Sequence, residues 1–362
     1  METFNFSAGP GVLPTPVISQ IKADLAQQEF SHLSMLEISH RSSQFEAIMN
    51  SAQQRLRQLM KIPADYEVAF IQGGGSLQFE MLPLNLATQL QKIAVLDSGN
   101  FAAKAAQAAQ MVGKEVDIVA SSKAEKYRYL PQLPKDFQAD TYDYLHLITN
   151  NTIEGTAYHA DNLPQTTGYL TADMSSNILA EHYDVRKFGA IFAGAQKNLG
   201  PAGVTIAIIK KDWLDEQNIT GVGPMMRYQN YFAKNSMYNT PPVFAIYALD
   251  LVLKWVQING GVSEMFRRNQ EKASKLYDFL DESKLFDAPV KREDRSLTNV
   301  VFTTHNQDRD ARIVSEATAN GLFNLGGHRS VGGFRASLYN AQPMAAVDRL
   351  IEFLHTVEKG EL

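Results

Sequence analysis

Residues 190–209 read AIFAGAQKNLGPAGVTIAII and give the clearest indication of the fold. A short apolar run leads into a segment of mostly small residues with a single lysine, and a second apolar run follows. Apolar runs without alternating polar residues are typical of strands that helices bury on both faces of a sheet. The stretch therefore predicts two buried strands, with Lys197 in the segment between them.

Five further short apolar runs precede this stretch and alternate with longer amphipathic segments. They lie at Glu67–Gln72, Lys92–Leu96, Glu115–Ala120, Tyr144–Thr149 and Tyr169–Asp173. Residues 15–29 and 44–60 carry apolar positions at helical spacing. This alternation predicts an α/β domain with a mostly parallel, seven-stranded sheet flanked by helices.

The last part of the chain follows a different pattern, which predicts a smaller α+β C-terminal domain. A long helical stretch covers residues 242–284, and strands at 297–303 and 335–338 accompany helices at 308–319 and 343–358. A chain of 362 residues exceeds the size at which one core keeps growing. We expect an N-terminal segment (1–15) packing with the small domain, a large domain (16–258) and a small C-terminal domain (259–362).

The composition excludes several classes of protein. The net charge of −5, without a block of Lys or Arg, argues against binding nucleic acid. The absence of cysteine excludes disulfides, thiolate metal clusters and thiol nucleophiles, and the histidines show no metal-ligand spacing. The N-terminal sequence lacks a secretory pattern and no apolar stretch reaches membrane-spanning length, so we expect a cytoplasmic protein without a membrane span.

Lys197 and Asp173 are the first candidates for chemistry. A lysine confined among small residues at a strand end has a lowered pKa, which makes its neutral amine available for Schiff-base chemistry; alternatively it is a solvated loop lysine. Asp173 ends an apolar strand, at the edge where ligands of open α/β sheets bind. It could protonate a cofactor ring nitrogen, or merely cap a following helix.

Glycine-rich and basic segments indicate anion binding. The run QGGGSLQF, residues 72–79, places three glycines between a strand and a helix, where backbone N–H groups can hold a phosphate; a tight turn without ligand is the alternative. His40-Arg41 and the run GGHRSVGGFR, residues 326–335, suggest a substrate with more than one anionic group. Solvated side chains are the alternative for each pair.

Taken in order, eight segments resemble the phosphoserine aminotransferase family, fold type I pyridoxal-phosphate enzymes of class V. They run from Phe4 to Asn340: FNFSAGPGVLP, SHRS, QGGGSLQF, NNTIEGT, TADMSSN, GAQKNLGPAG, YNTPPVF and GGHRSVGGFRASLYN. The resemblance implies an aspartate aminotransferase-like fold and a homodimer with shared active sites. It also implies transamination between glutamate and 3-phosphohydroxypyruvate in serine biosynthesis, and 4-phosphohydroxythreonine in vitamin B6 synthesis is a further possible substrate.

The resemblance also implies roles for individual residues. Lys197 would carry pyridoxal 5'-phosphate, one per subunit, as a Schiff base. The other cofactor residues would be Gly75, Ser76, Phe101, Thr152, Asp173, Gln196, and Asn239 and Thr240 from the neighbouring subunit. The substrate residues would be Arg41 and Arg335 for carboxylate and His40, His328 and Arg329 for phosphate. The family often has Trp in place of Phe101 and Arg in place of Ser76, which affects substrate specificity more than cofactor binding.

Other functions agree less well with the sequence. An aminotransferase for unphosphorylated substrates is the nearest alternative, against which the two His-Arg pairs argue. A cysteine desulfurase needs a thiol, and a nicotinamide dehydrogenase needs the GxGxxG spacing; the chain has neither. A non-catalytic cofactor-binding regulator would be expected to carry a basic DNA-binding segment at one end, which neither terminus shows.

Overall fold

The computed structural model describes residues 2–27 and 32–360, and its largest element is a seven-stranded sheet. The strand order is β2-β8-β7-β6-β5-β3-β4, and only β8 runs opposite to its neighbours β2 and β7. The strands are β2 (Tyr66–Ile71), β3 (Lys92–Asp97), β4 (Glu115–Ser121), β5 (Tyr144–Ile148), β6 (Leu170–Asp173), β7 (Ala190–Gly194) and β8 (Thr205–Lys210). The expected mostly parallel sheet is confirmed.

Helices bury both faces of this sheet. Alternate residues of β8 show this, because Ile206 and Ile208 belong to one apolar cluster, whereas Ala207 and Ile209 belong to another. The first cluster includes α1 (Thr15–Gln27), α2 (Ser43–Met60) and α7 (Val243–Ile258). The second includes α3 (Gly74–Leu86), α4 (Asn100–Met111), α5 (Lys211–Asp215) and α6 (Tyr228–Phe232). This two-sided burial explains why the strands read as continuous apolar runs.

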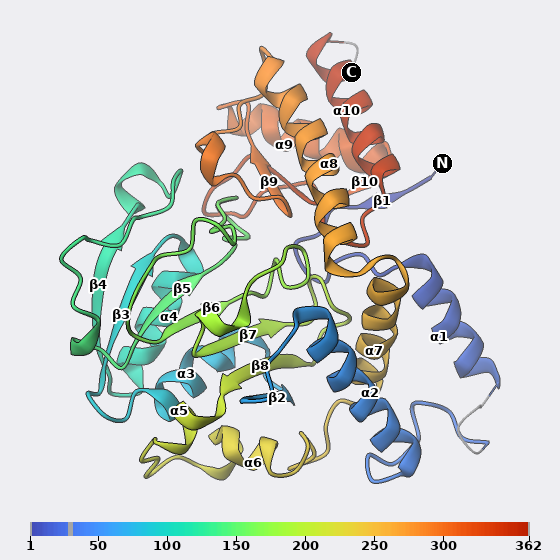
Figure 1. Ribbon diagram of the computed structural model, residues 1–362. Coiled ribbons are helices and arrows are strands. Elements are labelled where there is room, and N and C mark those ends of the chain that lie inside the picture. The colour runs from blue at the N-terminus through green and yellow to red at the C-terminus, as the bar shows by residue number, and fades with distance from the viewer. Residues whose placement is uncertain (1, 28–31, 361–362) are drawn as a thin grey trace.

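A smaller α+β part lies above the sheet, orange to red in Figure 1. In it β9 (Asn299–Phe302) pairs antiparallel with β11 (Phe334–Ser337), and β1 (Phe4–Asn5) pairs parallel with β10 (Leu322–Phe323). Its other helices are α9 (Gln307–Ala319) and α10 (Met344–Glu358). The side chains of Phe4 and Phe6 lie in the apolar cluster of this part. The exact boundaries between domains stay a prediction.

Helix α8 (Gly261–Glu282) connects the two cores. Its first turns contribute Val262 and Met265 to the core of the large sheet, and its last turns contribute Leu276 and Leu280 to the core of the small part. Among the described residues no single helix is long and apolar enough to cross a membrane. Only the pair α7 and α8, taken together, has the length and composition of a membrane span, and the two helices are bent by 83° relative to each other.

Sequence and structure differ mainly at element ends. The helix expected over residues 15–29 is described to Gln27, and the remainder of that range extends beyond the described residues. The strands expected at 297–303 and 335–338 are observed at 299–302 and 334–337, and Thr303 instead forms an isolated bridge with Asp287. These shifts do not move any candidate site residue to another element.

Candidate active site

Five chain segments meet at the carboxyl edge of the large sheet. Only β8 is antiparallel to the other strands of this sheet. The strands β2, β3, β5, β6 and β7 therefore all end at this edge. Ile71, the last residue of β2, and Gly194, the last residue of β7, both pair with Thr205 of β8. The glycine-rich turn after β2 and the lysine segment after β7 therefore flank the same strand end.

Lys197 lies three residues beyond the end of β7, in the turn that follows it, and its ammonium group has a hydrogen-bond partner. Its Nζ atom donates a hydrogen bond of 2.7 Å to Oγ1 of Thr152 and lies 5.1 Å from the centre of the Phe101 ring. Burial lowers the pKa of Lys197 to about 8, Arg335 acts in the same direction, and Asp173 and Glu154 oppose the effect. At pH 7 the amine is thus still mainly protonated, but its neutral fraction of about a tenth is far larger than that of an ordinary lysine.

Asp173 is the last residue of β6 and is buried next to the lysine. Its Oδ1 atom accepts a hydrogen bond of 2.8 Å from the backbone N–H of Ser175. Burial raises its pKa, whereas Lys197 and the bonds from Ser175 lower it. The chain after Asp173 forms turns rather than a regular helix, so Asp173 is not the N-cap of an α-helix.

The glycine-rich turn opens helix α3 as the sequence indicates. Helix α3 begins at Gly74, and Gly73 and Gly74 have φ angles of +98° and +68°, which favour glycine. A Cβ atom on Gly75 would lie 3.4 Å from Oγ of Ser175, an ordinary contact distance that places this turn next to the segment after Asp173. Ser76 is exposed in the first turn, where backbone N–H groups lack helical partners.

Arg335 belongs to the small part of the molecule and lies close enough to Lys197 for its charge to lower the pKa of the lysine. It lies on β11, is half-buried, and its Nε atom is buried without a hydrogen-bond partner among the described residues. Burial, followed by the charges of Arg335, Arg329 and Lys104, lowers the pKa of His328. Three positive charges, those of Arg335, Arg329 and Lys104, thus act on His328, and Arg335 also acts on Lys197. The sequence did not single out Lys104.

Four other candidates form a second group. His40, Arg41, Asn239 and Thr240 line one hollow of about 510 Å³, although about 200 residues separate the two pairs. Gln72 links this hollow to the glycine-rich turn, because its side chain bonds to the Thr240 carbonyl at 2.7 Å and to Asn239 at 3.0 Å. These four candidates therefore gather in a hollow of their own that adjoins the glycine-rich turn of the same chain.

The N-terminal segment packs directly on the lysine segment, a contact that the sequence did not predict. The N–H group of Gly11 bonds to the Gln196 carbonyl at 2.7 Å. A Cβ atom on Gly11 would lie 2.5 Å from the Lys197 carbonyl oxygen and 2.8 Å from Cδ2 of Tyr339. The hydroxyl of Tyr339 in turn donates to the Ala8 carbonyl. Only glycine fits at position 11, and the signal for it was the run SAGPG.

Comparisons with known proteins agree with this arrangement. Residues 3–350 match the pattern of the aminotransferase class-V family, so the chain belongs to that family. It is 67% identical over 360 residues, 99% of each chain, to the phosphoserine aminotransferase of Leuconostoc mesenteroides subsp. mesenteroides.

Solved structures of the same kind superpose closely. One is a phosphoserine aminotransferase studied for radiation damage of its Schiff base, with a TM-score of 0.95, 41% identity and 99% of each chain covered. Another is the phosphoserine aminotransferase of Trichomonas vaginalis with bound PLP, at a TM-score of 0.91, 34% identity and coverage of 98% of this chain and 100% of that one. The fold is that of fold type I aminotransferases.

Proposed function

We propose that this chain is a phosphoserine aminotransferase, which exchanges an amino group between glutamate and 3-phosphohydroxypyruvate with pyridoxal 5'-phosphate as cofactor. The main support is the geometry of the site, in which Lys197 has a lowered pKa and lies beside the buried Asp173. The chain is also 67% identical to such an enzyme over nearly its full length. The cytoplasmic location stays a prediction.

The residues at the sheet edge fit the cofactor. Lys197 would hold it covalently, Asp173 would face its ring nitrogen, Phe101 would cover its ring, and Gly75 and Ser76 would bind its phosphate at the start of α3. A Cβ atom on Gly74 would meet nothing within 4 Å, and no described side chain caps the start of α3, so the free backbone N–H groups of this helix end suit a phosphate. When bound, the cofactor withdraws electrons from the substrate Cα and so makes its proton removable.

The side chains then have distinct tasks. Asp173, if ionised against a cationic ring nitrogen, keeps that nitrogen protonated, and its burial strengthens the interaction. Nζ of Lys197, with its lowered pKa, moves the proton from the substrate Cα. Thr152 accepts a bond from that Nζ and restricts its position. Gln196 lies beside Lys197 and would contribute a further hydrogen bond to the cofactor.

Recognition of a substrate with two anionic groups follows from the basic side chains. Arg335, whose buried Nε has no hydrogen-bond partner in the described part of the chain, is suited to the substrate carboxylate. His328 and Arg329 would bind the phosphate. We infer that the hollow of His40, Arg41, Asn239 and Thr240 completes the site of a second copy in a homodimer. The resemblance implies that Asn239 and Thr240 serve the neighbouring subunit, and His40 and Arg41 line the same hollow.

Substrate discrimination tests the proposed activity. With glutamate as amino donor, kcat/KM should be more than about 100-fold higher for 3-phosphohydroxypyruvate than for hydroxypyruvate, because the cationic groups would otherwise stay unpaired. The preference should shrink in Arg329→Gln. Equal kcat/KM values for the two acceptors would contradict a preference for the phosphorylated substrate. They would favour the alternative of an aminotransferase for unphosphorylated substrates.

Subunit mixing tests the shared site. Lys197→Ala and Arg41→Ala should each be nearly inactive alone. If Arg41 serves the neighbouring subunit, each hybrid dimer regains one intact site, and an equal mixture should recover about a quarter of the wild-type activity. A mixture that stays inactive, although the subunits are shown to exchange, would contradict the shared site.

A further inference from the structure

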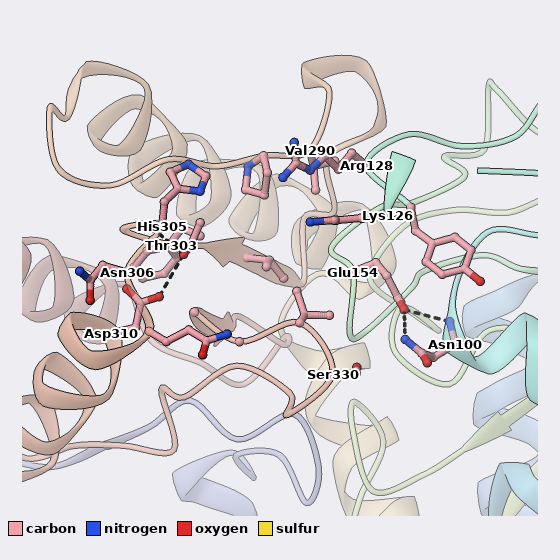
Figure 2. A pocket seen from close by; sticks show the side chains of 18 of the residues that line it. Asn100, Lys126, Arg128, Glu154, Val290, Thr303, His305, Asn306, Asp310 and Ser330 are labelled. Carbon is pink, nitrogen blue, oxygen red and sulfur yellow. Dashed lines mark hydrogen bonds between the residues drawn. The ribbon is translucent and has the colours of Figure 1, made fainter. Parts of the chain in front are cut away.

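Glu154 is a buried carboxylate beside the active site. Neither the sequence motifs nor the proposed mechanism assigns it a role. It lies in the turn after β5 that also carries Thr152, and its side chain is 5% exposed. Its Oε1 atom accepts two hydrogen bonds from Asn100, one from the backbone N–H at 2.9 Å and one from Nδ2 at 2.6 Å. Figure 2 shows both bonds, from the wall of the hollow between the two parts of the molecule.

These bonds fix the start of helix α4. Asn100 is the first residue of α4 and Phe101 the second, so the carboxylate holds the first turn from which the Phe101 ring extends toward Lys197. The preceding residue confirms how closely the carboxyl group fits. A Cβ atom on Gly99 would lie 2.7 Å from Oε2 of Glu154 and 2.8 Å from Oδ1 of Asn151. The carboxyl group thus occupies the space that any side chain at position 99 would need.

The environment of Glu154 is unfavourable for a purely structural cap. Its Oε2 atom is buried without a hydrogen-bond partner among the described residues, and burial raises its pKa although the bonds from Asn100 oppose this. A helix start is ordinarily capped by an exposed Ser, Thr, Asp or Asn without such a desolvation cost. Costly buried polar groups of this kind concentrate at functional sites.

We propose that Glu154 is a positioning residue of the active site, which acts through Asn100 to hold the Phe101 ring in place over the cofactor ring. This inference rests on the proposed function, because it needs a cofactor at Lys197. It assigns the carboxyl group a geometric task, in which its hydrogen-bond acceptor and its shape matter and its charge does not. A glutamine, which keeps both, should therefore serve in its place.

The test measures binding of pyridoxamine 5'-phosphate to the apoprotein by calorimetry, since this ligand does not need the covalent link to Lys197. Glu154→Ala should weaken binding about two- to tenfold, the range that corresponds to a loss of ring packing. Glu154→Gln should bind within about twofold of wild type. Glu358→Ala is the control, because that carboxylate also accepts backbone and side-chain hydrogen bonds at a helix end, but from Ser283, Lys284 and Leu285 just after α8.

A double-mutant cycle with Phe101→Ala tests whether Glu154 affects ligand binding through the Phe101 ring. If Glu154 acts through the ring, Glu154→Ala should weaken binding no further once Phe101 is alanine. The proposal would be overturned if the affinity losses of Glu154→Ala and Phe101→Ala multiplied in the double variant. It would also be overturned if Glu154→Gln bound the ligand as weakly as Glu154→Ala. If Glu154→Ala does not fold, Asn100→Ala takes its place in the cycle with the same expectation. A wild-type protein that does not bind the ligand would instead refute the proposed function.

Discussion

Replacing Lys197 with methionine should stabilise the protein without its cofactor. Burial lowers the pKa of this lysine from its ordinary 10.5 to about 8. At about 1.36 kcal/mol per pH unit, the folded protein loses about 3 kcal/mol by holding the ammonium group there at neutral pH. The lost bond to Thr152 offsets about 1 kcal/mol. The variant should therefore be about 2 kcal/mol more stable at pH 7.

The sign of the pH dependence follows from the same lowered pKa. Below about pH 8 the lysine is protonated in both the folded and the unfolded state, so the full cost of burial is present. Between about pH 8 and 10.5 the unfolded state binds more protons, and the wild-type protein gains stability as the pH rises. The advantage of Lys197→Met should thus decline through this window.

Urea unfolding of the two apoproteins at pH 7 and at about pH 10 measures this difference. Lys104→Met is the control, because it removes an exposed lysine next to the same Phe101 ring and should shift the midpoint little at either pH. A Lys197→Met protein that is less stable than wild type at pH 7, or whose advantage does not change with pH, would refute the reasoning.

Three further outcomes are expected. The rate at which the apoprotein takes up pyridoxal 5'-phosphate should rise about tenfold per pH unit below pH 8 and level off above it, because only the neutral amine of Lys197 reacts; a flat stopped-flow profile would contradict this. Asp173→Asn should retain the cofactor but lose about 100-fold or more in kcat, and steady-state rates near wild type would remove the carboxylate from the mechanism. Gly11→Ala should lower stability in urea by about 1–3 kcal/mol, since its Cβ meets Lys197 and Tyr339, whereas Gly223→Ala has open space at φ −60° and should have little effect.

The sequence predicted the large sheet well because burial on both faces leaves a strong local signal. Each apolar run from Glu67 to Ile209 corresponds to a strand, with ends that differ by at most a few residues. Lys197 and Asp173 were identifiable because each follows such a run, and the ends of parallel strands meet at one edge. The glycine-rich turn could be placed for the same reason.

The remaining parts of the site depend on contacts that no local pattern encodes. Glu154 was part of a quoted motif, but its bonds to Asn100 arise only when the turns after β3 and β5 are adjacent. Likewise, the packing of Gly11 on the lysine segment joins residues almost 190 positions apart. The roles of the substrate residues, and the supply of Asn239 and Thr240 across a dimer, stay predictions that rest on the family resemblance. The use of Arg41 across a dimer rests on its place in the same hollow as those two residues.

The visible absorption band of the bound cofactor, followed through one half-reaction at a time, tests the central claim most directly. We expect the band to disappear when glutamate is added and to return when 3-phosphohydroxypyruvate follows, with neither change in Lys197→Ala. A wild-type protein that stays colourless after incubation with pyridoxal 5'-phosphate would contradict the proposed cofactor site. A band that responds to glutamate but not to 3-phosphohydroxypyruvate would contradict the proposed substrate.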